Sequence, residues 1–121
     1  MSLPTEWSFS QQENQTGNIA QIVVPASGPT IRHVLTSFAA RLTAVPPGGA
    51  VILEVYVFDG ANLMFRKYMA CSAPAAGVFN VDTLNEEGPI VGSPATALTV
   101  RFQNAAVVGI IEWVGAKGYD T

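Results

Sequence analysis

The sequence predicts a single all-β domain, an antiparallel β-sandwich with an extended N-terminal arm. Three observations predict this fold. From Ile19 onward, short apolar runs alternate with Gly- and Pro-rich breaks about every 8 to 12 residues, a rhythm typical of sandwiches and barrels. The 121 residues suffice for one domain with a core of its own. Hydrophobic residues make up 49% of the chain and charged residues 12%, a balance that excludes intrinsic disorder.

The clearest strand covers residues 51–58, where aliphatic side chains occupy alternate positions from Val51 to Val57. Turn-forming residues follow at 59–62, so we expect residues 63–69 to return as the second strand of a hairpin. Further strands are expected over residues 19–24, 77–82, 97–103 and 107–114. Trp113, in the apolar run of the last strand, is expected in the core.

Residues 30–45 leave two structures open. Helical spacing is shown by Ile31, Val34, Leu35, Phe38, Ala39 and Leu42. As a strand, the segment places Val34, Phe38 and Leu42 on one face together with Thr36 and Ala40. We predict a strand, because a single helix would displace a strand that the sandwich needs.

Residues 1–18 form the predicted arm, and residues 19–121 the sandwich domain. Gln11 and Gln12 begin a polar, amide-rich run without periodicity. Trp7 and Phe9 are two residues apart, so on an extended segment both rings point the same way. The rings either fold back onto their own domain or anchor the arm on a partner, because aromatic side chains are common at interfaces. Trp7, Phe9, Gln11 and Gln12 are therefore the candidate partner-binding residues.

Charge and hydropathy limit the partners that we expect. The formal net charge is −3 and the six basic residues are dispersed, so the chain lacks the clustered cations of a nucleic-acid-binding surface. No segment approaches the roughly 20 apolar residues of a membrane span. The N-terminus has no basic region followed by an apolar stretch, so we expect no signal peptide and synthesis in the cytoplasm.

The sequence offers little chemistry for catalysis. His33 is the single histidine and Cys71 the single cysteine, and both are expected to be structural. Glu86 and Glu87 are expected in a solvated loop at residues 85–89. Glu54 and Glu112 lie within strands and are expected to point outward or to pair with Arg66 or Arg101. We therefore expect no enzyme, no metal site and no cofactor.

The order of strands and breaks resembles a known class of proteins. A Thr/Ser-containing strand opens at 33–37, a Pro-Pro-Gly-Gly break follows at 46–49, and a hydrophobic hairpin turns about Asp59 and Gly60. The segments 88–100 and 108–115 come next. Over residues 30–119 this pattern resembles the small virion structural proteins of tailed bacteriophages, several of which are jelly-roll-like capsid decoration (cement) proteins.

This resemblance implies a jelly-roll-like sandwich that binds the outer surface of the phage head. Such a protein bridges neighbouring major capsid protein subunits and stabilises the shell, often as a homotrimer. A trimer engages several sites at once, so its later contacts form at high local concentration. The low charge suits permanent packing against partners, and the resemblance carries no catalytic residues.

Two other functions remain open from the sequence. A compact sandwich also suits a tail, fibre or baseplate component of a virion. A carbohydrate- or receptor-binding module would use exposed aromatic side chains, for which Trp113 and Tyr119 are the possible platforms.

Overall fold

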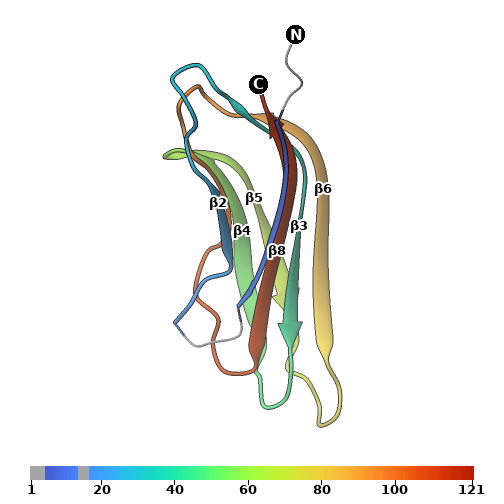
Figure 1. Cartoon of the computed structure of the whole chain (residues 1–121). Helices are drawn as coiled ribbons and strands as arrows, with labels where there is room; N and C mark the ends of the chain where they lie inside the picture. Colours follow the sequence, from blue (N-terminus) through green and yellow to red (C-terminus); the bar gives the residue numbers. More distant parts are fainter. Residues whose placement is uncertain (1–4, 14–16) are drawn as a thin grey trace.

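The protein is a β-sandwich of two four-stranded antiparallel sheets, which confirms the predicted fold class (Figure 1). The computed structural model describes residues 5–13 and 17–121. Its strands are β1 (Thr5–Glu13), β2 (Gln21–Val24), β3 (His33–Ala44), β4 (Val51–Asp59), β5 (Asn62–Cys71), β6 (Asn80–Val91), β7 (Leu98–Phe102) and β8 (Ile110–Asp120). One sheet has the order β1-β8-β3-β6 and the other the order β2-β7-β4-β5.

The strand pairs follow from one long hairpin rolled up on itself. Pairing joins β1 to β8, β2 to β7, β3 to β6 and β4 to β5. The turn of this hairpin lies between β4 and β5 at Gly60, whose positive φ of 60° suits glycine. Rolling then brings β8 beside β3 and β7 beside β4, which gives the strand order of a jelly roll.

Residues 30–45 contain a strand, as predicted, and an irregularity in it explains their helical spacing. Between Leu35 and Ser37 the register of β3 shifts against both neighbouring strands. Thr36 is an extra residue relative to β8, whereas β6 has two residues, Gly88 and Pro89, opposite it. Such a bulge sets Leu35 and Phe38 three residues apart on the same inward face. The prediction that Val34 and Thr36 share the inward face of Phe38 is therefore wrong, and Thr36 is exposed.

The core lies between the two sheets and consists of the alternate side chains of each strand. Val55, Val57, Val100 and Phe102 are fully buried on the inner face of one sheet. Leu42, Val114 and Ala116 are among the residues that meet them from the other sheet. Cys71 belongs to this core, as expected, and burial raises the pKa of its thiol.

Two expectations about carboxylates are wrong. Residues 85–89 are not a loop but part of β6, because an edge strand tolerates Pro89, which has no N–H to donate. Glu112 points inward and is fully buried, where its Oε1 accepts a hydrogen bond from the backbone N–H of Ala20 at 3.0 Å. This carboxylate provides an acceptor for the chain entering β2.

The predicted arm contributes an edge strand to its own domain. β1 pairs with β8 along its whole length, from Thr5 opposite Asp120 to Glu13 opposite Glu112. Near the start of β1, Trp7 Nε1 donates a hydrogen bond to Asp120 Oδ1 at 3.0 Å. His33, which is buried, bridges the same Asp120 oxygen and the carbonyl oxygen of Pro25, both at 2.6 Å. Residues 1–4 and 14–16 of the predicted arm lie outside the described residues.

Candidate functional site

The outer face of the β1-β8-β3-β6 sheet is hollowed over a row of small side chains. Strand register places Ser10, Gly115 and Ala39 side by side on β1, β8 and β3, with Asn85 next to them on β6. The hollow over this row has a volume of about 560 Å³, within the usual range for small-molecule sites of roughly 300 to 1,000 Å³. We call it the Trp113 hollow, after its largest side chain.

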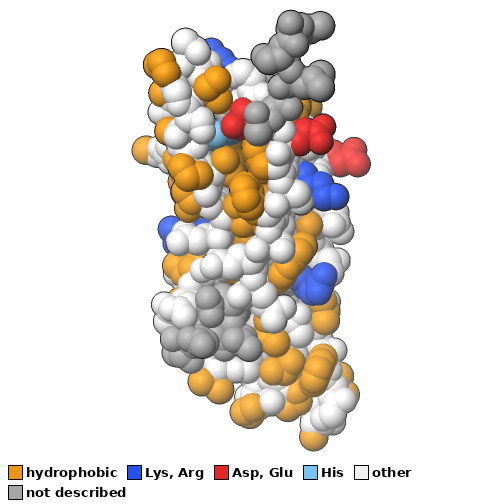
Figure 2. Space-filling view, in the orientation of Figure 1, with side chains coloured by type: hydrophobic (Ala, Val, Ile, Leu, Met, Phe, Trp, Pro, Cys, Tyr) orange, Lys and Arg blue, Asp and Glu red, His pale blue; other side chains and the backbone are white. Residues whose placement is uncertain are grey.

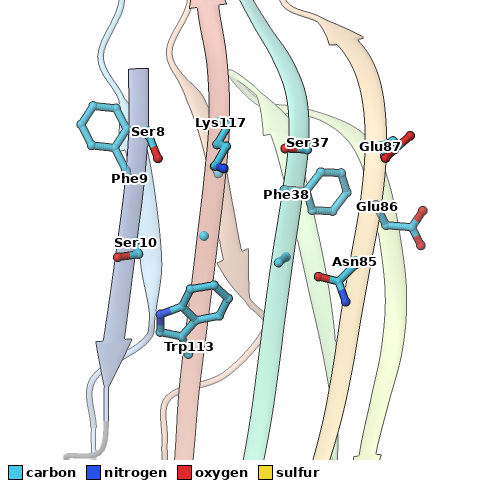
Figure 3. Close-up of a pocket in the computed structure, with 13 residues that line it drawn as sticks. Ser8, Phe9, Ser10, Ser37, Phe38, Asn85, Glu86, Glu87, Trp113 and Lys117 are labelled. Atoms are coloured by element: carbon cyan, nitrogen blue, oxygen red, sulfur yellow. The ribbon is translucent and has the colours of Figure 1, made fainter. Parts of the chain in front are cut away.

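Trp113 lies on this outer face, so its expected place in the core is wrong. Its indole packs against Gly115, where an added Cβ would be only 2.7 Å from Cη2 of the ring. The Cζ of Arg41, the cross-strand neighbour of Trp113, is 5.0 Å from the centre of the ring. Viewed from outside the sheet, Figure 3 shows the indole face-on. Gly115 therefore lets the ring lie flat along the sheet, where the Arg41 guanidinium lies over it.

Polar side chains surround the indole. Lys117, Ser37 and Glu87 form the row next to Gly115, and Asn85 lies on β6 (Figure 3). Within the described part of the chain, the side chains of Lys117, Glu87 and Asn85 make no hydrogen bond or ion pair. Their donors and acceptors are therefore available to a ligand.

A second hollow continues the first along β1 and β8. It has a volume of about 540 Å³ and shares Ser8 and Lys117 with the Trp113 hollow. Tyr119 lines it, together with Glu6 and Thr36. Because side chains alternate along a strand, Trp113 and Tyr119 lie on the same face of β8, roughly 20 Å apart. We call the second cavity the Tyr119 hollow.

The four residues proposed from the sequence lie on both sides of β1. Gln12 is opposite Trp113 on the outer face. Gln11 points to the inner side, where its Oε1 accepts a hydrogen bond from the N–H of Gln21 at 2.6 Å. Trp7 packs against the core, and Phe9, 45% exposed, stacks on it with ring centres 5.8 Å apart. Both rings thus point the same way, as expected, and Trp7 folds back onto its own domain.

A different surface lies at one end of the sandwich, where four connections meet. Three of them, between β3 and β4, between β5 and β6, and between β7 and β8, form the surface that we call the loop end. The fourth, between β1 and β2, lies beside it, where Gly17 and Asn18 share backbone hydrogen bonds with Ala106. Residues 45–50, 72–79 and 103–109 contain no Asp, Glu, Lys or Arg. Phe79 and Val108 are 67% and 69% exposed there. Figure 2 shows hydrophobic side chains at this lower end, without red or blue ones.

Hydrogen bonds hold the loop end in shape. The N–H of Val45 donates to the carbonyl of Gly109 at 2.8 Å and so joins two of the three loops. Turns close by hydrogen bonds from Val78 to Ala75 and from Ile110 to Val107, both 3.0 Å long. The exposed apolar side chains are therefore presented by an ordered backbone.

Metal-binding groups and membrane-spanning helices were also sought among the described residues. In this part of the chain, no group of three or more His, Cys, Asp or Glu side chains could hold a metal ion. No helix over residues 5–13 and 17–121 is long and apolar enough to cross a membrane.

Sequence reasoning missed most of the Trp113 hollow. The signal was the alternation of Trp113, Gly115, Lys117 and Tyr119, which places all four on one face of a strand. The intervening Val114 and Ala116 are the residues that the core buries. In comparisons with known proteins, no family model and no curated protein sequence matches this chain.

Proposed function

We propose that the protein is a structural component of a virion, a capsid decoration protein that attaches to the outer surface of a phage head through its loop end. The observation that carries this proposal is the absence of charge from three loops that expose large apolar side chains together. Exposed apolar patches mark surfaces that pack against a partner.

The physical basis of attachment is burial of apolar surface. Covering a side chain such as Phe79 or Val108 contributes roughly 1.5–3 kcal/mol. The three loops carry no charge that has to be stripped of water when they dock, so this gain is not offset by desolvation of a loop charge. A few such side chains give a weak site, which becomes strong when several copies bind together.

The proposed location on a phage head and the proposed assembly state both rest on the resemblance of residues 30–119 to tailed-phage decoration proteins. On this proposal the partner is the major capsid protein, and the chain forms a homotrimer that bridges its neighbouring subunits. The jelly-roll strand order agrees with this proposal, because the fold is found among viral capsid proteins. The role is binding and not catalysis.

Attachment tests the proposal. Heads assembled from the major capsid protein of the encoding phage, without this chain, are mixed with purified chain and sedimented. We expect many copies bound per head, and a loss of at least about tenfold in affinity for Phe79→Lys with Val108→Lys, because a charge would be buried against the partner. Few copies at one vertex would indicate a tail component and overturn the decoration role.

A matched control uses exposed apolar residues outside the loop end. Ile52, 67% exposed on β4, and Val23, 50% exposed on β2, are changed to Lys in the same way. These variants should bind heads like the unaltered chain. Equal losses in both pairs of variants would show that the loop end is not the attachment surface.

A further inference from the structure

We propose that the Trp113 hollow binds an uncharged oligosaccharide, with one sugar ring stacked on the Trp113 indole. This site goes beyond the proposed attachment to a head and does not depend on it, because the hollow and the loop end are different surfaces. The ligand class follows from the aromatic platform, the polar side chains around it and the charge of the hollow.

The platform is the first reason. A flat indole has a negatively polarised face, and the apolar face of a sugar ring presents weakly positive C–H groups to it. Trp113 lies flat because Gly115 has no Cβ, and the outward face of its ring is seen in Figure 3. The Arg41 guanidinium lies over the ring, with its Cζ 5.0 Å from the ring centre, so a sugar that stacks on the indole displaces this flexible, exposed side chain.

The polar groups are the second reason. Each sugar hydroxyl both donates and accepts hydrogen bonds. Asn85 supplies a donor and an acceptor, Glu87 supplies acceptors and Lys117 supplies donors, all lining the same hollow. None of these side chains is engaged with another described residue, so no internal hydrogen bond has to break when a ligand binds.

The charges of the hollow argue for a neutral ligand. The positive Lys117 lies in the same row as the negative Glu87, and the charge of Glu86, which also lines the hollow, is paired with Lys67 at 3.4 Å. A polyanion such as a nucleic acid requires several cations, which this hollow does not supply.

The position of the hollow argues against a peptide bound as an added strand. Its floor consists of β8 and β3, which are the two inner strands of their sheet. The backbone groups of an inner strand are already paired on both sides, whereas strand addition requires a free sheet edge. Binding must therefore use side chains, as recognition of a sugar does.

The length of the surface indicates a chain of sugars. The Tyr119 hollow continues the Trp113 hollow through Ser8 and Lys117. The two aromatic side chains are roughly 20 Å apart along β8, a span that several linked sugar rings can cover. We therefore assign a second contact to Tyr119.

Isothermal titration calorimetry of the full chain tests this site. The probes are maltohexaose, cellohexaose, xylohexaose and chitohexaose. We expect at least one of them to bind, with an affinity at least about tenfold weaker for Trp113→Ala. Gly115→Ala should weaken the same probe while keeping the indole, because the added Cβ pushes the ring off the sheet.

Two further variants keep the test decisive. Asn85→Ala alters an exposed side chain without a described partner, so it preserves the fold and should still weaken binding. Tyr68→Ala removes an aromatic ring that is 65% exposed on the other sheet, and it should bind like the unaltered chain. The site is overturned if none of the four probes binds, or if Trp113→Ala and Asn85→Ala bind as tightly as Tyr68→Ala. Attachment of the chain to heads, measured separately, is unaffected by either outcome.

Discussion

At the scale of single residues, Glu54 shows how a nearly buried charge is kept on the outer face of the β2-β7-β4-β5 sheet. Its Oε2 accepts a hydrogen bond from the Tyr56 hydroxyl at 2.5 Å, and its Oε1 lies 3.3 Å from Nε of Arg66. The expected pairing with Arg66 is confirmed. The Tyr56 hydrogen bond, with smaller contributions from Tyr68 and Arg66, holds the pKa of Glu54 below its usual value of 4.5. The same hydrogen bond raises the pKa of Tyr56 above 10.0.

These two shifts predict a window of pH in which the pair stabilises the fold. The lowered pKa of Glu54 means that its contribution is complete above 4.5 and is lost as the pH falls through the lowered value. The raised pKa of Tyr56 means that its contribution is present below 10.0 and is lost as the pH rises through the raised value. Urea unfolding should therefore show the largest difference between the unaltered chain and Glu54→Gln between these limits. A difference that stays constant into strong acid would contradict this account.

Trp7 and Phe9 are predicted to differ in their effect on stability, although they are neighbours on one side of β1. Trp7→Ala removes packing against the core and leaves Asp120 without the indole donor, so we expect a loss of about 2–4 kcal/mol in the free energy of unfolding. Phe9→Ala removes a ring that is nearly half exposed and should cost less than about 1 kcal/mol. Chemical denaturation measures both, and equal losses would argue against this placement of β1.

At the scale of strands, the sequence predicts elements better than it predicts their faces. The hairpin of β4 and β5 and the alternation of β7 were predictable, because regular alternation has a single interpretation. The inner face of β3 could not be predicted, because the extra residue Thr36 changes the spacing of the inward side chains from two residues to three. The continuation of β6 through Pro89 could not be predicted either. Proline is acceptable in this strand only because the strand lies at a sheet edge, and the sequence does not show which strands are edges.

The bulge in β3 is itself testable by deletion of Thr36. Without this residue, Leu35 opposite Gly118 is followed directly by Ser37 opposite Lys117, so the pairing with β8 becomes regular and the rest of β3 keeps its register and its faces. His33 still reaches Asp120 and Phe38 stays in the core, so we expect a cooperative thermal melt. Deleting Ala39, where the pairing with β8 is regular, serves as the contrast: one half of β3 must then slip by one position, which moves its side chains to the opposite face, and we expect a loss of more than about 4 kcal/mol or no cooperative unfolding. Equal effects of the two deletions would contradict the bulge.

At the scale of the whole molecule, the jelly roll separates two surfaces with different chemistry. The connections of the loop end meet because β3, β5 and β7 all finish at that end of the sandwich, as β1 does. The outer face of the β1-β8-β3-β6 sheet carries the Trp113 hollow instead. Neither surface could be predicted from residue spacing along the chain, because each combines segments that are distant in sequence and that only the jelly-roll topology brings together. Of the four residues proposed from the sequence, Phe9 lines the Trp113 hollow and Trp7 lines the Tyr119 hollow, while Gln12 is the cross-strand partner of Trp113.

The absence of charge from the loop end predicts how attachment responds to salt. Contacts between charges weaken as salt rises, since the screening length falls from about 10 Å at 0.1 M to about 3 Å at 1 M. The loop end has no charge to screen, and excluded salts such as ammonium sulfate strengthen apolar burial. Heads carrying this chain should therefore retain it when washed in about 1 M NaCl and bind it more tightly in ammonium sulfate. Release of the chain by NaCl would mean that ionic contacts hold it, and the loop end could not then be the main attachment surface.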